Sequence, residues 1–199
     1  MSAMNSETAW GWPARVLHWV MALMIVILLV VGIYMSNFIP DTLEGIGQRV
    51  ELTQMHKSFG FTVFVLAVLR VVWRLANPTP KLPDAMPGWQ KAASHASHFA
   101  LYGLIFIMPL TGWLMASASP LNNADAYPTQ IKNMVFGLFE MPDPFPTGTE
   151  SLESIFHTAH FLSSLGLVLI LGLHIGAALK HHLVDRDAIL RRMVSGRGE

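Results

Sequence analysis

Four apolar stretches, each long enough to cross a lipid bilayer, constrain this chain more than any other feature of its sequence. A bilayer-spanning helix needs roughly 20 consecutive, mostly apolar residues. The four stretches cover residues 14–36, 50–75, 93–116 and 154–182. Only 13% of the residues are charged, which is about half of what a soluble domain carries. The sequence therefore predicts an all-α integral membrane four-helix bundle, with residues 1–199 forming one transmembrane domain.

The connectors between these stretches contain proline and glycine, as expected for loops, and the longest connector covers residues 117–154. Apolar residues recur at helical spacing around residues 131–139, so we expect a short amphipathic helical segment there. The first apolar stretch is longer than the core of a usual signal peptide, and no small-residue cleavage pattern follows it. We therefore interpret it as a retained transmembrane helix.

The distribution of positive charge predicts the orientation of the four helices. If the N-terminus is cytoplasmic, ten lysines and arginines lie on the cytoplasmic side and three on the opposite side. The ten are Arg15, Arg70, Arg74, Lys81, Lys91, Lys180, Arg186, Arg191, Arg192 and Arg197, and the three are Arg49, Lys57 and Lys132. Cytoplasmic loops are enriched in Lys and Arg, so we expect both termini in the cytoplasm.

The absence of cysteine limits the chemistry of the chain. It excludes disulfides, thiolate-ligated iron–sulfur clusters, thiolate-ligated haem and the covalent attachment of a c-type haem. The formal net charge of zero gives no reason to expect a nucleic acid partner. Any redox cofactor must be held by other residues, and the nine histidines are the obvious source of ligands.

Four of the histidines form two pairs at two depths of the predicted bundle. His160 and His174 are 14 residues apart on the last stretch, which places them within about 40° of one helix face and roughly 21 Å apart along the axis. His56 lies at the outer depth, like His160, and His18 lies at the inner depth, like His174. Bundles hold cofactors between facing helices. Each pair therefore predicts the two axial ligands of one iron porphyrin.

The residues four positions after these histidines support the pairing, because a porphyrin beside a helix needs small neighbours. Those residues are Ala22, Gly60, Ser164 and Ala178. Bulky residues follow the other candidates, with Phe161 after His157, Phe99 after His95 and Tyr102 after His98. Small residues are also common in membrane helices for packing alone. His157, which lies about 100° from the face of His174, is the rival of His160 as outer ligand.

Two other interpretations of the histidines stay open. Any single one can be a neutral side chain that is hydrogen-bonded to a neighbouring carbonyl, although ionisable groups inside a bilayer are functional candidates by default. Two H-x-x-H motifs, His95/His98 and His157/His160, have a spacing that can chelate zinc. On the predicted topology these motifs lie on opposite sides of the membrane, so we do not favour a shared metal site.

Four blocks of sequence resemble the bacterial cytochrome b561 family of small membrane cytochromes. The blocks are ARVLHWVMAL, QMHKSFGFTVFVLAVLRVVWRLANPTP, HASHFALYGLIFIMPLTGWLM and LGLHIGAALKHHLVDRDAILRRM, and the resemblance covers nearly the whole chain. It implies two haem b groups, one ligated by His18 and His174 and the other by His56 and His160. It also implies a multi-pass protein of the bacterial inner membrane, surrounded by membrane lipid.

The resemblance further implies ubiquinone as a partner near the inner haem, and superoxide or a periplasmic redox protein as the outer partner. The residues that we expect around the quinone or the haem propionates are Arg15, Arg70, Arg74, His95, His98 and His181. The alternatives are arginines that snorkel to lipid headgroups and an end-of-helix role for His181 and His182. The segment DRDAILRRM is expected to be a basic segment that faces anionic lipid.

The sequence is consistent with three functions. The first is a di-haem quinone oxidoreductase, of which a superoxide oxidase is the most specific form. Lys57 and Arg49 would attract an anionic donor, although the loops on that side are acidic. The second is a cytochrome b subunit that anchors a larger redox complex. The third is a histidine-lined ion transporter without haem.

Overall fold

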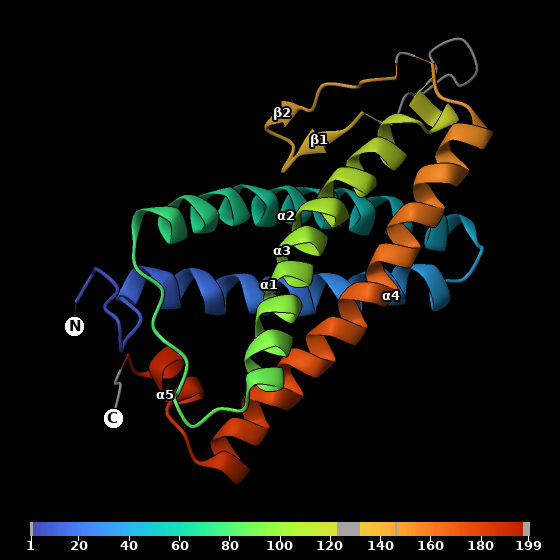
Figure 1. The fold of residues 1–199 in the computed structure, drawn as a ribbon. Helices are drawn as coiled ribbons and strands as arrows, with labels where there is room; N and C mark the ends of the chain where they lie inside the picture. Colours follow the sequence, from blue (N-terminus) through green and yellow to red (C-terminus); the bar gives the residue numbers. More distant parts are fainter. Residues whose placement is uncertain (1, 123–131, 146, 197–199) are drawn as a thin grey trace. The chain divides into compact units, whose positions relative to one another are not determined.

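Four long helices dominate the computed structural model, which describes residues 2–122, 132–145 and 147–196. Each of the four is long and apolar enough to span a membrane, which confirms the four predicted spans. In chain order the elements are α1 (Trp12–Asn37), α2 (Leu43–Ala76), α3 (Gly88–Ser117), η1 (Pro120–Asn122), β1 (Met134–Val135), β2 (Phe139–Glu140), α4 (Glu150–Lys180), the π-helical turn η2 (His181–Asp185) and α5 (Ile189–Val194) (Figure 1). Arg197, one of the cationic residues used to predict the orientation, lies outside the described residues.

Helix α2 begins seven residues earlier than residue 50, where the apolar stretch begins. Thr42 caps it, because its side-chain oxygen accepts a hydrogen bond from the Gly45 amide at 3.1 Å and its carbonyl accepts one from Ile46 at 2.8 Å. Glu44 lies in the first turn, where a negative charge favours the helix dipole. Two glycines near the start of α2 are more typical of a loop than of a helix. Hydropathy alone therefore predicts a helix start that is too late in the sequence.

The prediction of an amphipathic helical segment around residues 131–139 was wrong. Apart from Ile131, which lies outside the described residues, this segment forms the antiparallel hairpin β1–β2, with Val135 paired to Phe139. The Leu138 amide bonds to the Val135 carbonyl at 2.9 Å, and the two residues between them, Phe136 and Gly137, have φ angles of 49° and 70°. Positive φ at both central residues is typical of a tight hairpin turn and is incompatible with a continuing right-handed helix.

The chain forms two compact units, and each of the four long helices contributes one segment to each unit. The first, which we call the terminal unit, comprises Met1–Ala22, Val65–Leu104 and Gly166–Glu199. The second, the loop unit, comprises Leu23–Phe64 and Ile105–Leu165. His18, His98 and His174 therefore belong to the terminal unit, whereas His56 and His160 belong to the loop unit.

Backbone carbonyls of the C-terminal segment bind side chains of α1 in the terminal unit. Arg15 donates a hydrogen bond to the Val194 carbonyl and the indole of Trp19 donates one to the Met193 carbonyl, each at 3.0 Å. Arg192 donates to the carbonyl of Lys81 at 2.8 Å. The segment DRDAILRRM, expected to face lipid, therefore also makes specific contacts within the protein.

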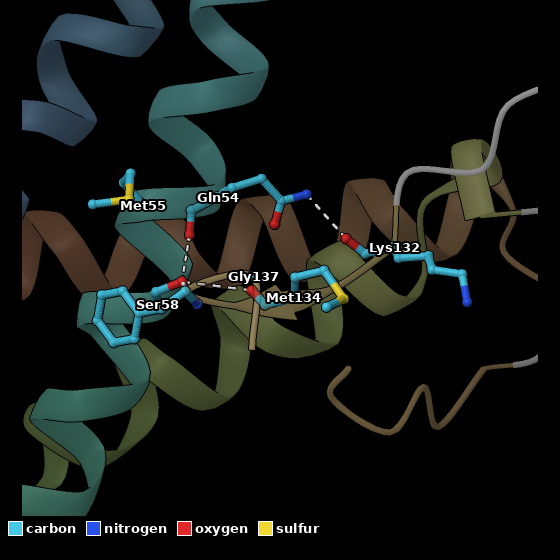
Figure 2. A pocket seen from close by; sticks show the side chains of 7 residues that line it. Gln54, Met55, Ser58, Lys132, Met134 and Gly137 are labelled. Atoms are coloured by element: carbon cyan, nitrogen blue, oxygen red, sulfur yellow. Dashed lines mark hydrogen bonds between the residues drawn. The ribbon is translucent and has the colours of Figure 1, made fainter. Parts of the chain in front are cut away.

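The hairpin packs on α2 in the loop unit (Figure 2). The hydroxyl oxygen of Ser58 accepts a hydrogen bond from the Phe136 amide at 2.9 Å, and the Lys57 ammonium donates to the side-chain oxygen of Asn133 at 2.7 Å. Gln54 donates to the Lys132 carbonyl at 3.0 Å. A cavity of about 510 Å³, open to the surface, lies between this face of α2 and the hairpin. The hairpin is thus attached beside the turn of α2 that carries His56.

Candidate functional site

Three imidazoles from three helices meet in the terminal unit. The ring centres of His18 on α1 and His174 on α4 are 6.3 Å apart, with an angle of 80° between the ring planes. His98 on α3 lies nearer to His174, at 5.1 Å between ring centres. The Nδ1 of His98 is 2.8 Å from the Ser94 carbonyl of its own helix. Because a carbonyl only accepts, this nitrogen carries the proton and the Nε2 lone pair stays available.

Two arginines of α2 approach this histidine cluster together. Arg70 contacts the Nδ1 of His18 at 3.0 Å, and because a guanidinium only donates, that nitrogen of His18 is the acceptor. The Nε of Arg70 donates to the hydroxyl of Tyr102 at 3.3 Å. The guanidinium carbons of Arg70 and Arg74 lie 5.9 Å and 5.7 Å from the centre of the Tyr102 ring.

The contacts of Tyr102 with the arginines were not predicted from the sequence, where this residue stands out only as a bulky neighbour of His98. The available indication was its position one helical turn after His98, on the same face of α3, together with a polar hydroxyl in an otherwise apolar stretch. The structure brings it to both arginines, whereas Phe99, which follows His95, is 82% exposed.

Two imidazoles face each other in the loop unit. The ring centres of His56 on α2 and His160 on α4 are 6.4 Å apart, with an angle of 75° between the ring planes. The Nδ1 of His160 lies 3.1 Å from the Met108 carbonyl and 3.1 Å from the hydroxyl of Thr111. Since the carbonyl requires a donor, His160 carries its proton on Nδ1 and leaves Nε2 free to bind a metal. The Nδ1 of His56 has no hydrogen-bond partner among the described residues.

Glycines of neighbouring helices make room for both loop-unit imidazoles. A Cβ atom on Gly112 of α3 would lie 3.2 Å from Cε1 of His160, and one on Gly32 of α1 would lie 3.5 Å from Cε1 of His56. The first of these distances is tighter than ordinary van der Waals contact, so His160 occupies space that any larger residue at position 112 would need. A Cβ atom on Gly60, one turn after His56, would have no atom of another described segment within 4 Å.

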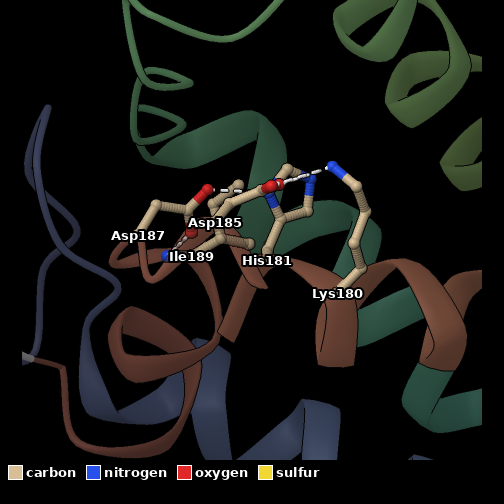
Figure 3. Close-up of polar contacts among 5 residues, drawn as sticks. All are labelled: Lys180, His181, Asp185, Asp187 and Ile189. Atoms are coloured by element: carbon tan, nitrogen blue, oxygen red, sulfur yellow. Dashed lines mark hydrogen bonds and ion pairs between the residues drawn. The ribbon is translucent and has the colours of Figure 1, made fainter. Parts of the chain in front are cut away.

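The other predicted site residues have different surroundings. His95 and His157 are exposed, so each H-x-x-H motif has one exposed and one partly buried histidine. Arg15 is buried at the docked C-terminal segment. His182 is exposed, and His181 binds the carboxylates of Asp187 at 2.7 Å and Asp185 at 3.1 Å (Figure 3). Lys180 neutralises Asp185 at 2.7 Å.

The spacing of the two facing pairs suits axial ligation of one iron each. A bond from a metal to an imidazole nitrogen is about 2.0 Å long, so two imidazoles on opposite sides of one metal have ring centres about 6.3 Å apart. The pairs His18–His174 and His56–His160 have this separation, at 6.3 Å and 6.4 Å. The separation of 5.1 Å between His98 and His174 is too short for it. Each pair comes from two helices, as a cofactor inside a bundle requires.

Comparison with known proteins finds similar sequences over nearly the full length of the chain. The model of the prokaryotic cytochrome b561 family matches residues 9–196. Cytochrome b561 homolog 2 of Escherichia coli K12 is 30% identical over 195 residues, which cover 98% of this chain and 95% of the relative. Cytochrome b561 homolog 1 of the same strain is 26% identical over 182 residues, covering 91% of this chain and 94% of the relative.

A third relative carries a more specific name. The probable superoxide oxidase CybB of Yersinia pestis is 26% identical over 178 residues, which cover 89% of this chain and 91% of the relative. The family match extends from residue 9 to residue 196. The four membrane-spanning helices and the facing histidine pairs are consistent with it. This chain belongs to the prokaryotic cytochrome b561 family of haem b-binding, electron-transferring proteins of bacterial membranes.

Proposed function

We propose that this protein is a di-haem b cytochrome that carries electrons between the outer side of the membrane and the quinone pool. In this proposal His18 and His174 ligate one haem, and His56 and His160 ligate the other. The observation that carries it is the ring-centre separation of both pairs, 6.3 Å and 6.4 Å, which matches the separation required for two imidazoles on one iron. A haem held by two imidazoles would supply a one-electron carrier that is poorly suited to binding oxygen.

The hydrogen bonds of His160 support its assignment as a ligand. Imidazoles that bind a metal usually donate their second nitrogen to a carbonyl, which fixes the ring orientation and the tautomer. His160 makes such a contact with the Met108 carbonyl. His157, the rival ligand, is exposed, and Phe161 one turn after it is 53% exposed. These observations favour His160 as the outer ligand.

His18 requires one change of partner before it can ligate iron through Nε2. Its Nδ1 accepts a hydrogen bond from Arg70, which assigns the proton to Nε2, the nitrogen that would bind the metal. Ligation therefore requires Arg70 to release His18, and the proton then moves to Nδ1. The released guanidinium is a suitable partner for a propionate carboxylate, and its contact with the Tyr102 hydroxyl keeps it close by.

Quinone chemistry fits the terminal unit, where proton donors accompany the histidine pair. Reduction of a quinone consumes two electrons and two protons. His98 lies beside His174, and His181 is held by Asp187 and Asp185. Both histidines are therefore candidates for the groups that pass protons to the quinone. Arg74, held on the Tyr102 ring, is a candidate for binding a quinone oxygen.

Superoxide is the proposed electron donor on the outer side, in line with the printed name of the Yersinia pestis relative. Two superoxide ions would give two electrons and leave as two molecules of oxygen for each quinone reduced. The cations available to attract them are partly neutralised: Arg49 pairs with Asp41 at 3.0 Å, and Lys57 is held by Asn133, which binds Asp143 at 2.6 Å. A periplasmic redox protein is therefore the alternative donor.

A pyridine haemochrome assay on the purified protein tests the proposal. We expect two haem b groups per chain, because the chain has two imidazole pairs with the required separation. A protein without haem would contradict the electron-transfer function and favour the histidine-lined transporter. Rapid mixing of the oxidised protein with superoxide and, separately, with a quinol then compares the two donors through the rate of haem reduction.

A further inference from the structure

The two histidine pairs differ in the charge of their surroundings. In the terminal unit, two guanidinium groups lie at the histidine cluster. Arg70 must release His18 before that histidine can ligate iron, but its contacts with Tyr102 keep its charge close by. In the loop unit, the contacts of His160 are a backbone carbonyl and a hydroxyl, and both are neutral. The cation next to His56 in sequence, Lys57, is bound by Asn133, which also binds the carboxylate of Asp143.

Tyr102 is the residue that holds the two arginines together. Arg70 and Arg74 are four residues apart on α2, so they occupy the same helix face and their like charges repel each other. The negative face of an aromatic ring attracts cations, and both guanidinium carbons lie within 6 Å of the Tyr102 ring centre, at 5.9 Å and 5.7 Å. The hydroxyl of the same residue accepts a hydrogen bond from Arg70. Tyr102 thus offsets the repulsion that would otherwise separate the arginines.

Charge at a redox centre changes its reduction potential in a known direction. A reduced haem carries one positive charge less than an oxidised haem, so nearby cations favour the reduced form and raise the potential. Burial strengthens this effect because the surrounding dielectric is low. A hydrogen bond from a ligating imidazole to a carbonyl acts in the opposite direction, because it makes the imidazole a stronger electron donor to the iron.

We propose that Tyr102, by holding Arg70 and Arg74 beside the His18–His174 pair, raises the reduction potential of a haem bound by that pair. The haem of the terminal unit would then have a higher potential than the haem of the loop unit, and a single electron added to the protein would reside mainly on the terminal haem. The effect would be a redistribution of one electron, with no bond formed or broken and no proton required. This inference rests on the proposed di-haem function, with Tyr102 acting as a positioning residue rather than a catalytic one.

A redox titration of the haem-loaded protein tests which haem has the higher potential. The two haems are followed by their absorption spectra, and a His56→Ala variant, which retains only the terminal pair, identifies the terminal haem. We expect at least a tenfold preference of the electron for the terminal haem, which corresponds to about 59 mV for a one-electron couple. Equal potentials, or a higher potential for the haem of the loop unit, would overturn the inference.

Variants of Tyr102 test its positioning role separately. Tyr102→Leu removes both the ring and the hydroxyl, and should lower the potential of the terminal haem while leaving the other haem unchanged. Tyr102→Phe keeps the ring and should therefore keep most of the difference in potential between the two haems. Tyr34→Leu is the matched control, because Tyr34 stacks on Phe38 in the loop unit, with ring centres 6.2 Å apart, and should leave the terminal haem unchanged.

Haem content separates failure of this inference from failure of the proposed function. If the unaltered protein binds no haem, the proposed function itself fails. If Tyr102→Leu binds two haems and the terminal potential does not move, or both potentials move equally, Tyr102 has no positioning role. Should Tyr102→Leu lose haem, Arg74→Gln removes one cation without removing the ring. The potential of the terminal haem must be lower in Arg74→Gln than in the unaltered protein for the inference to stand. An unchanged potential overturns the inference.

Discussion

His160 and His157 are three residues apart on α4, yet their surroundings differ completely. His160 lies against Gly112 and donates to the Met108 carbonyl, both on α3, whereas His157 is exposed. The sequence favours His160 through its spacing from His174, and the structure adds the hydrogen bond that orients the ring. That hydrogen bond could not be predicted from the sequence, because its acceptor is a backbone carbonyl 52 positions away on another helix.

This difference predicts the haem content of two matched variants. If two haems bind as proposed, His160→Ala should lose one of them, because His56 would then be the only imidazole left to hold it. His157→Ala should keep both, because an exposed side chain contributes neither a ligand nor a buried hydrogen bond. A pyridine haemochrome assay with both variants at equal protein concentration measures the difference. Loss of haem from His157→Ala, with two haems in His160→Ala, would transfer the ligand role to His157.

At the scale of elements, the hairpin β1–β2 shows how a tertiary contact overrides a local pattern. The apolar spacing of residues 131–139 favours a helix, but the segment turns back at Phe136 and Gly137 with positive φ angles. Its backbone then binds the side chains of α2, with the Phe136 amide on the Ser58 hydroxyl. The partners are 78 residues apart in sequence, so no local window contains the information that decides the structure.

Removal of the Ser58 hydroxyl should loosen the hairpin. Ser58 is 1% exposed, and Ser58→Ala leaves the Phe136 amide without its acceptor, which costs about 1–3 kcal/mol for a buried donor. We expect faster hydrogen exchange at the Phe136 amide and faster proteolysis within the hairpin. Thr62→Ala is the control, because among the described residues the hydroxyl of Thr62 bonds to the Ser58 carbonyl of its own helix and not to the hairpin. Equal exchange in both variants would mean that Ser58 does not fasten the hairpin.

At the scale of the whole molecule, the predicted topology divides the lysines and arginines unequally between the two sides of the membrane. It assigns ten to the side of the termini and three to the side of the long loop. This imbalance predicts that both termini face the cytoplasm. The predicted orientation places the His18–His174 pair towards the cytoplasm and the His56–His160 pair towards the periplasm.

The lack of native cysteine allows a direct test of this orientation. Ser2→Cys and Ser151→Cys each introduce one exposed thiol, the first near the N-terminus and the second at the start of α4. With a membrane-impermeant maleimide added to intact spheroplasts, only Ser151→Cys should react. After detergent lysis both should react, which controls for accessibility. Labelling of Ser2→Cys in intact spheroplasts would reverse the assigned orientation.

The sequence by itself determined the four membrane spans and the depth of each histidine along its helix. Both follow from local properties, namely the apolar length that a bilayer requires and the constant rise of a helix. It also carried the family resemblance, which the comparisons confirm.

Only the tertiary structure decided which side chains meet across the helices. Three features depend on how each helix is rotated about its own axis. They are the ring separations of the two histidine pairs, the placement of two arginines on Tyr102 and the attachment of the hairpin to Ser58. That rotation is fixed by side-chain packing between segments far apart in the sequence, such as His160 against Gly112. Local sequence patterns do not encode it.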